Sequence, residues 1–335
     1  MSSEPQISIV LPLYNALAYL ECGLATINAQ SFKNWELVAV NDGSTDNTRE
    51  RFLEITRDWK QSVKLIDRQN GGGFAARNTG LDHATAKYIA FFDVDDRWYP
   101  QHLQELFDIL ESHSEVDWVY AANKIIDLTE GEKLVAESNF LNQGYPKEFL
   151  ALNAIRHGDL SIINDPRAAE YQFRYGLHLG QQFSLLRREV FEGYRFRSDY
   201  RNEGADQVSV IRALKSGFKL AYLNHIHGEY AIHANNASAG CKGAPLEKYI
   251  RLRKALIRGF QELGSEVELS ISELKALHWK LGQDYFWQLG YNLSWQNGFY
   301  AEAFGYFKKG LFYSPFDWRM LKTYILCSIR SRFLK

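Results

Sequence analysis

Short runs of apolar residues recur along the first hundred positions, and stretches with helical spacing separate them. The runs are rich in β-branched residues and predict strands buried on both faces; they are Ile7–Leu11, Glu36–Val40, Val63–Ile66 and Tyr88–Phe92. The stretches between and after them predict helices at Ala16–Ala29, Thr48–Trp59, Phe74–His83 and Gln101–Ser112. This alternation predicts an α/β fold of right-handed βαβ units, with a mostly parallel sheet covered by helices. Ligands of such sheets bind beyond the carboxyl ends of the strands.

The pattern changes in the second half of the chain. Between about Asp127 and Gln182 the periodicity weakens, which predicts a loop-rich insertion. Two more strands, Phe183–Arg187 and Lys219–Leu223, flank a predicted helix at Gln207–Ser216. The remainder has helical spacing nearly throughout, for example at Glu247–Leu263 and Ile271–Asn292. We therefore expect one α/β domain over residues 1–240 and a helical region over residues 241–335.

Composition narrows the class of protein. The chain has 335 residues, and 46% of them are hydrophobic, which excludes a disordered protein. Its formal net charge of -1 argues against a protein that binds nucleic acid mainly through the positive charge of the whole molecule. Its three cysteines, Cys22, Cys241 and Cys327, are too far apart for a metal knuckle and suit a reducing compartment. The acidic start and the lack of an apolar run of about 20 residues favour a cytoplasmic protein over a secreted or membrane-spanning one.

Two polar turns follow predicted strands. In Asn41–Asp46, Gly43 permits a tight turn and Asp42 projects a carboxylate that can accept a hydrogen bond from a nucleobase. Further on, Gly71–Gly73 precede a predicted helix that carries Arg77, and the amides of such a helix terminus favour anions. Ordinary turn and cap chemistry explains each segment equally well when it is taken alone.

Three carboxylates follow the fourth strand directly, in Phe92–Asp96. Crowded carboxylates at a buried strand end repel one another, and hard divalent cations such as Mn²⁺ or Mg²⁺ relieve that repulsion. Alternation along a strand puts Asp93 and Asp95 on one face, while Asp96 points away or caps the next helix. A solvated acidic turn is the alternative, but the position at the end of a parallel strand favours the metal.

Further candidate residues lie later in the chain. Asp206 opens a predicted helix and is either a helix-terminus residue or a general base. His225 and His227 would share one face of a strand, but a zinc site lacks support, since no cysteine or fourth ligand sits at suitable spacing. A single histidine, His233, joining the carboxylate metal site is the better hypothesis, with ordinary hydrogen-bonded histidines as the alternative.

The order of these motifs resembles that of the family 2 glycosyltransferases, which have the GT-A fold. The resemblance covers roughly residues 6 to 240 and is carried by four segments: Ser8–Asn15, Val40–Asp46, Gly73–Asn78 and Phe92–Asp96. It implies a Rossmann-like catalytic domain with a nucleotide-sugar half at about 6–126 and an acceptor half at about 127–240. It also implies inverting transfer of a sugar from a nucleotide diphosphate, assisted by Mn²⁺ or Mg²⁺, with UDP the first candidate nucleotide.

The resemblance implies a role for each matched position. The nucleotide pocket would be formed by Pro12, Tyr14, Asn15, Asp42, Arg77 and Asp93. Asp42 would contact the base and Arg77 would lie near the nucleotide or diphosphate. Asp95 would ligate the metal, Asp93 would face the ribose or the metal, and Asp206 would activate the acceptor hydroxyl. Bacterial surface polysaccharide or glycolipid synthesis is the context that the family implies.

Two departures from the family pattern leave an alternative open. Ala205–Asp206 stands where the family commonly has Glu-Asp, and no arginine precedes His233 in the segment Ala231–Asn236. A catalytically impaired nucleotide-sugar-binding or scaffold protein of the same fold is therefore the alternative function. A sugar-phosphate nucleotidyltransferase would need a glycine-rich basic loop after the first strand, and Pro12–Asn15 does not supply one.

The C-terminal helical region is basic. Residues 246–335 carry 14 Lys plus Arg against 8 Asp plus Glu, and from Arg319 onward there are five basic residues and no acidic one. Such an amphipathic basic helix can lie on an anionic membrane, which would suit a glycan acceptor on a lipid carrier at the inner face of the plasma membrane. Packing against the catalytic domain is the equal alternative.

Overall fold

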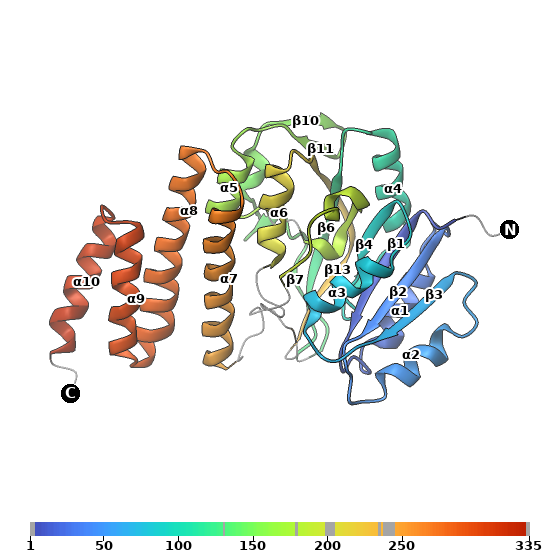
Figure 1. The fold of residues 1–335 in the computed structure, drawn as a ribbon, viewed down its shortest axis with the longest axis horizontal. Coiled ribbons are helices and arrows are strands. Elements are labelled where there is room, and N and C mark those ends of the chain that lie inside the picture. Colours follow the sequence, from blue (N-terminus) through green and yellow to red (C-terminus); the bar gives the residue numbers. More distant parts are fainter. Residues whose placement is uncertain are drawn as a thin grey trace.

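The computed structural model describes residues 4–129, 131–177, 180–197, 205–233, 236 and 245–332. A central sheet is flanked by helices, and further helices extend from one end of the molecule (Figure 1). The strands of the sheet are β1 (Ile7–Leu13), β2 (Trp35–Asn41), β3 (Ser62–Asp67), β4 (Tyr88–Phe91), β5 (Arg97–Trp98), β6 (Trp118–Asp127), β7 (Lys133–Ala136), β10 (Ala154–His157), β11 (Leu160–Ile163), β12 (Ser184–Arg187) and β13 (Leu220–Ile232). A separate hairpin is formed by β8 (Leu141–Asn142) and β9 (Tyr145–Pro146).

The sheet is mixed, and its N-terminal half is parallel. The strand order is β10-β11-β13-β6-β12-β4-β1-β2-β3, with β5 and β7 paired to β13 and β6 outside this path. Parallel pairs join β1 to β2 and β4, β2 to β3, and β6 to β13. β12 is antiparallel to both β4 and β6 and connects the two parallel groups. The α/β fold with helix-covered, largely parallel strands is thereby confirmed.

The helices that cover this sheet create a core on each of its faces. They are α1 (Leu20–Asn28), α2 (Thr48–Thr56), α3 (Gly73–His83), α4 (His102–Ser112), α5 (Ala168–Arg174) and α6 (Ala205–Lys215), with short 3₁₀ turns η1 (Glu148–Ala151), η2 (Gln181–Phe183) and η3 (Arg188–Phe191). On β1, Ile9 and Leu11 pack with side chains of α1 and α4, whereas Val10 packs on the opposite face with Phe74 of α3. The prediction that β1 is buried on both faces is confirmed.

Three details of the strand prediction are wrong. β3 is only partly buried, because it is the edge strand of the sheet and has a neighbour on one side alone. The long strand β6 was missed, although the apolar run Trp118–Ala122 signals it. The expected loop-rich insertion contains β7 to β11 and α5, and its strands β10 and β11 extend the sheet. The strands β7 to β11 are four residues or shorter, so they carry little periodicity.

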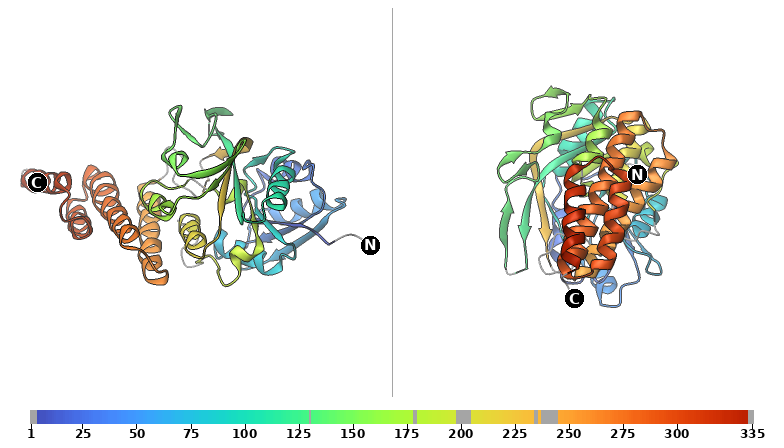
Figure 2. Two further views of the ribbon diagram at one scale, coloured as in Figure 1. Left: turned by 90° about the horizontal axis from the view of Figure 1, so that it is seen from above. Right: turned by 90° about the vertical axis from the view of Figure 1, so that its left-hand side faces the viewer.

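The C-terminal helices continue outward from the sheet, and α10 lies furthest from it (Figures 1 and 2). These elements are α7 (Leu246–Glu266), α8 (Ile271–Gln283), the π-helix η5 (Asp284–Ser294), the 3₁₀ turn η6 (Trp295–Asn297), α9 (Tyr300–Tyr313) and α10 (Trp318–Ser331). α7 contacts α6, and α8 contacts α5. A capping box of Ser270 and Glu273 starts α8. None of the described helices is long and apolar enough to cross a membrane.

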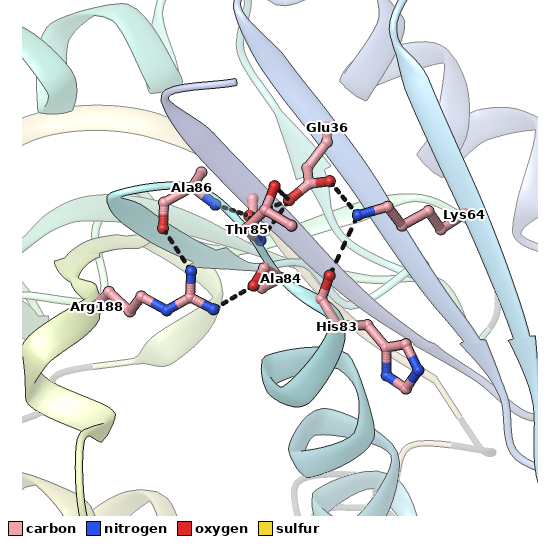
Figure 3. Close-up of polar contacts among 8 residues, drawn as sticks. Glu36, Lys64, His83, Ala84, Thr85, Ala86 and Arg188 are labelled. Atoms are coloured by element: carbon pink, nitrogen blue, oxygen red, sulfur yellow. Dashed lines mark hydrogen bonds and ion pairs between the residues drawn. The ribbon is translucent and has the colours of Figure 1, made fainter. Parts of the chain in front are cut away.

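A buried carboxylate holds the sheet together at the amino ends of its parallel strands. Glu36 of β2 is 1% exposed and accepts hydrogen bonds from Ser8 Oγ (2.6 Å), Thr85 N (2.7 Å), Thr85 Oγ1 (2.7 Å) and Lys64 Nζ (2.8 Å). Figure 3 shows how this network continues through Lys64 to the carbonyl of His83 at the end of α3. Burial alone would raise the pKa of Glu36, but the hydrogen bonds from Lys64, Ser8 and Thr85 lower it below the ordinary value.

Replacing Glu36 with Gln is expected to lower the free energy of unfolding at pH 7 by about 2–3 kcal/mol, because hydrogen bonds to a charged acceptor are lost in a buried place. Because the pKa of Glu36 is lowered, this stabilisation is present at neutral pH and is lost as the pH falls through that pKa. Urea unfolding at pH 7 and in acid measures both effects. Glu54→Gln, at an exposed ion pair with Arg51, should change stability by less than about 0.5 kcal/mol. An equal effect of the two substitutions at pH 7 would contradict the prediction.

Candidate active site

The carboxyl ends of β1 to β4 meet at one edge of the sheet, because these four strands are parallel neighbours. The loops that follow them carry most of the predicted site residues. β4 ends at Phe91, and Asp93 to Asp96 form a turn closed by a 3.0 Å hydrogen bond from Asp96 N to Asp93 O. The alternation expected of a strand therefore does not govern these aspartates, and each carboxylate meets different partners.

Asp93 is the counter-ion of a buried arginine. Its Oδ1 accepts a hydrogen bond from Arg77 Nη2 at 2.6 Å, and its Oδ2 accepts one from Gln182 Nε2 at 3.1 Å. The Arg77 side chain, from α3, is 10% exposed, and its guanidinium lies over the rings of Phe74 (5.3 Å) and Phe91 (5.8 Å). A guanidinium in such surroundings needs a charged partner, and Asp93 supplies it.

Asp95 meets His233 at the end of β13. His233 Nε2 lies 2.8 Å from Asp95 Oδ2, and Asn236 Nδ2 donates to the same oxygen at 3.3 Å. The imidazole stacks on Tyr19 of the β1–α1 connection with ring centroids 4.5 Å apart. Sequence reasoning placed Asp95 and His233 together, but it missed Tyr19 and Asn236. The position of Asn236 three residues after His233 was the available signal, whereas no pattern distinguishes Tyr19.

Asp95 and His233 fit one end of a divalent metal site. Their nearest ligand atoms are 2.8 Å apart, and one oxygen plus one imidazole nitrogen suits Mn²⁺ or Mg²⁺ completed by other oxygens. Asp93 does not join them. Within the described residues, the only three Asp, Glu, His or Cys side chains grouped closely enough for one ion lie elsewhere, at Glu105, His225 and His227. Of the three expected metal ligands, Asp95 and His233 therefore lie together, whereas Asp93 lies against Arg77.

Asp96 ties the acidic turn to β13. It is 1% exposed, and its Oδ1 accepts a hydrogen bond from Ala231 N at 3.0 Å, while its buried Oδ2 has no partner among the described residues. Burial, followed by the charges of Asp95 and Asp93, raises the pKa of Asp96 well above its ordinary value. Of the two alternatives for Asp96, pointing away or capping the next helix, the second is wrong, because Gln101 is the N-cap residue of α4.

Asp206 lies in the first turn of α6 and is partly buried. Its Oδ1 accepts a hydrogen bond from Gln207 N at 2.9 Å. Burial raises the pKa of Asp206, the positive charge of Arg77 opposes that rise, and the negative charge of Asp93 adds to it. Asp206 thus belongs to the same electrostatic group as the Arg77–Asp93 pair, and a raised pKa makes its carboxylate a stronger base. Glu203 and Gly204, just before it, lie outside the described residues, as do Ala234, Asn235 and Cys241.

The β1–α1 loop is fastened to the β2–α2 loop through Asn15. This residue has φ +47°; its Oδ1 accepts from Thr45 N at 2.8 Å, and its own N–H donates to Ser44 Oγ at 3.1 Å. Asparagine is one of the few residue types that tolerate such a left-handed conformation. Tyr14 stays 53% exposed beside it, and Pro12 lies near the carboxyl end of β1. The carboxyl end of β1 and the start of its loop thus contain Pro12, Tyr14 and Asn15 at one edge of the sheet.

Asp42 already has partners within the chain. It is 2% exposed and accepts hydrogen bonds from Gly71 N (3.0 Å), Gly72 N (2.7 Å) and Arg68 Nη1 (3.0 Å). The amides of Gly71 and Gly72, expected to attract an external anion, are thus bound to an internal carboxylate that shapes the entry to α3. Sequence reasoning missed Arg68, although its position directly after β3 puts it at the same sheet edge.

Comparison with known proteins identifies the family of the chain. The sequence profile described as glycosyl transferase family 2 matches residues 8–195, which is more than half of the chain. The chain belongs to glycosyltransferase family 2. EpsE of Bacillus subtilis, which is named as a glycosyltransferase, is 34% identical over 275 residues, covering 78% of this chain and 91% of that protein.

Other family 2 relatives match over a shorter region. The UDP-Glc:alpha-D-GlcNAc-diphosphoundecaprenol beta-1,3-glucosyltransferase WfgD of Escherichia coli is 33% identical over 122 residues, or 36% of this chain and 47% of that protein. The glycosyltransferase YibD of E. coli K12 is likewise matched over 36% of its length. The chain therefore aligns with about a third to a half of these two relatives.

Solved structures show the same GT-A fold. Residues 1–349 of TarS from Staphylococcus aureus, in complex with UDP-GlcNAc, superpose with a TM-score of 0.59 at 17% identity, over 91% of this chain and 81% of that chain. The mannosyltransferase PcManGT from Pyrobaculum calidifontis, in complex with GDP-Man and Mn²⁺, gives a TM-score of 0.54 at 16% identity, over 100% of this chain and 82% of that chain. These structures confirm the expected fold, and the family match confirms the expected enzyme class.

Proposed function

We propose that this glycosyltransferase is inverting and metal-dependent, and that it moves a sugar from a nucleotide diphosphate, UDP first among the candidates, to a hydroxyl acceptor in bacterial surface polysaccharide or glycolipid synthesis. The observation that carries the proposal is the gathering of Asp95 with His233, and of Arg77 with Asp93 and Asp206, around one end of the sheet. TarS with UDP-GlcNAc and PcManGT with GDP-Man and Mn²⁺ support a donor and a metal of these classes.

The reaction follows from the roles of these side chains. The carboxylate of Asp206 accepts the proton of the acceptor hydroxyl as the hydroxyl oxygen forms its bond to the anomeric carbon. On the opposite side of that carbon, the bond to the diphosphate oxygen breaks, and the nucleoside diphosphate leaves with the bonding electrons. A single displacement of this kind inverts the configuration of the anomeric carbon. The charges of Arg77 and Asp93 act on the pKa of the general base Asp206.

Donor binding is assigned to the sheet edge over residues 6–126, and acceptor binding to residues 127–240. The nucleotide side is lined by Pro12, Tyr14 and Asn15, and the nucleobase lies beside the glycine turn that Asp42 holds through Gly71 N and Gly72 N. A Mn²⁺ or Mg²⁺ ion held by Asp95 and His233, with Asp93 near the nucleotide, would neutralise the negative charge of the departing diphosphate.

A transfer assay tests the proposal directly. Purified protein is mixed with radiolabelled UDP-, GDP-, CDP- or dTDP-sugars, Mn²⁺ and a bacterial membrane extract that supplies lipid-linked glycans. We expect one nucleotide class to label the lipid fraction, with an equimolar release of the nucleoside diphosphate. Donor binding without label transfer to any acceptor fraction would favour the impaired, nucleotide-sugar-binding alternative that Ala205 suggested.

The rate of transfer is expected to depend on pH through Asp206. Because burial raises the pKa of Asp206 above its ordinary value of 3.8, the base is protonated, and therefore inactive, at a higher pH than for an exposed aspartate. The acid limb of kcat/KM should accordingly lie above that value, with activity rising as the pH increases through it. A profile of kcat/KM against pH at saturating metal measures this limb. An unchanged limb in Asp206→Asn would assign the titration to another group.

The acceptor side of the proposal includes contact between α10 and an anionic membrane. Met320 and Cys327 of α10 are buried on the side that faces the neighbouring helices. An apolar stripe at helical spacing remains exposed: Trp318 (64%), Leu321 (42%), Ile325 (57%) and Ile329 (51%). Basic residues flank it, namely Arg319, Lys322, Arg330 and Arg332. An exposed apolar stripe with basic flanks matches the interface of an anionic bilayer.

Co-flotation with lipid vesicles tests this contact. The protein should float with vesicles of phosphatidylglycerol and phosphatidylcholine but not with phosphatidylcholine alone, and less so in high salt. Leu321→Glu with Ile325→Glu should reduce binding at least tenfold, because two charges replace the apolar centre of the stripe. Ile271→Glu, at a residue 76% exposed on α8, is the matched control and should bind normally. Equal binding of the double variant and the wild type would contradict the contact.

A further inference from the structure

Glu105, His225 and His227 form a cluster of metal-ligating side chains at the contact between α4 and β13. Glu105 Oε2 lies 3.0 Å from His225 Nδ1 and 3.0 Å from His227 Nε2. All three ligand atoms lie within 4.8 Å of one another. His227 is six positions before His233 on the same chain segment, which corresponds to roughly 20 Å along an extended strand. The cluster is therefore separate from the candidate active site.

We propose that Glu105, His225 and His227 bind a zinc ion that clips β13 to α4. Two imidazole nitrogens and one carboxylate oxygen are a donor set that Zn²⁺ commonly takes, with water in the fourth position. Tetrahedral ligands at about 2.0–2.1 Å from zinc stand roughly 3.3 Å apart, and the two contacts of 3.0 Å made by Glu105 Oε2 are close to that separation. The side chains of His225 and Glu105 are 50% and 38% exposed, which leaves the fourth position open to solvent.

The backbone of β13 is irregular on both sides of these histidines. Its pairing with β6 shifts register between Leu223 and Ile226, and again between Ile226 and Glu229. Alternation along a strand already puts His225 and His227, two positions apart, on one face, and the irregular pairing leaves both rings within reach of α4. Here both imidazoles reach the same oxygen of Glu105, although His227 is fully buried and His225 is exposed. The strand thus presents its two histidines to one point on α4.

A buried partner supports the inner ligand of the cluster. His227 Nδ1 lies 3.2 Å from Nδ1 of His102, which is itself fully buried. Histidines that bind metals usually hydrogen-bond through their second ring nitrogen, which fixes the tautomer. His102 thus holds the ring of His227 with its Nε2 directed at Glu105 Oε2.

Calorimetric titration of the full, untagged chain with Zn²⁺ tests the proposal. The titration is done in the Asp95→Ala background, so that the proposed donor-site metal does not contribute. One equivalent of Zn²⁺ should bind and should raise the unfolding temperature. His225→Ala at an exposed position and Glu105→Gln at a partly exposed one should each weaken binding at least tenfold. His83→Ala, at an exposed histidine whose ring nitrogen Nδ1 lies 2.8 Å from Thr79 O of its own helix, is the matched control and should leave the affinity unchanged.

Two results would contradict the proposed zinc site. One is the absence of Zn²⁺ binding in the Asp95→Ala chain. The other is binding that neither His225→Ala nor Glu105→Gln weakens, which would assign the ion to another site. Circular dichroism of each variant verifies that it is folded, so that a loss of binding reports on the ligands themselves. The proposal does not depend on the donor chemistry, because its readout is metal affinity.

Discussion

Replacing Asp206 with Asn is expected to lower the turnover number for sugar transfer by about 10²- to 10⁴-fold, the usual contribution of a positioned general base. Asparagine keeps the shape of the side chain but cannot accept the acceptor hydroxyl's proton. Donor affinity should change little, because the proposed donor contacts come from the β1 to β4 edge. Steady-state kinetics with the labelled donor, together with calorimetric donor binding, separate the two effects.

The matched control for this experiment is Asp108→Asn on the outer surface of α4, where the carboxylate contacts Gln104 in an exposed position. That variant should transfer sugar at the wild-type rate. If Asp206→Asn also kept its full rate, Asp206 would have no part in the chemistry. Loss of donor binding together with turnover would indicate that Asp206 supports the fold of the site instead.

Replacing Asp95 with Ala should have a second large effect. The substitution removes the carboxylate that faces His233 Nε2 and accepts a hydrogen bond from Asn236 Nδ2. Metal ions supply several kcal/mol of charge stabilisation in such reactions, and about 1.4 kcal/mol corresponds to a factor of ten. Turnover should therefore fall by about 10²-fold or more, and the concentration of Mn²⁺ needed for half-maximal activity should rise.

Asp82→Ala is the matched control for Asp95→Ala. Asp82 forms an exposed ion pair with Arg195, and such pairs contribute little to stability. Activity as a function of Mn²⁺ concentration should coincide for Asp82→Ala and the wild type. An Asp95→Ala enzyme with an unchanged metal requirement would remove Asp95 from the proposed ligands and leave the acidic turn as a structural feature.

The first half of the fold could be predicted from the sequence because its strands are buried on both faces. Runs such as Ile7–Leu11 and Tyr88–Phe92 have no polar alternation, and the helices between them have regular apolar spacing. The strands of residues 127–182 could not be predicted in this way, because they are short and because β11 joins the sheet by pairing with β13, about 60 residues further along the chain. Their order in the sheet is a property of tertiary contacts.

The candidate site was predicted in part, for a related reason. Positions after strand ends pointed to Asp42, Asp93 and Asp95, since parallel strands bring their carboxyl ends together. The sequence did not indicate which side chains contact these carboxylates. Asp93 lies against Arg77, and Asp42 against Arg68 and the glycine amides, because of side-chain directions that spacing does not specify. The strand alternation used for Asp93 and Asp95 failed because β4 ends before them.

The central claim is a metal-dependent site for a nucleotide-sugar donor, and thermal unfolding tests it without any knowledge of the acceptor. UDP-, GDP-, CDP- and dTDP-sugars are compared with and without Mn²⁺, in the wild type and in Asp95→Ala. A ligand at 100 times its Kd stabilises the folded state by about 2.7 kcal/mol. The account predicts that one donor raises the unfolding temperature by several degrees, only with Mn²⁺ and only in the wild type. No stabilisation by any donor, or the same stabilisation in Asp95→Ala, would contradict it.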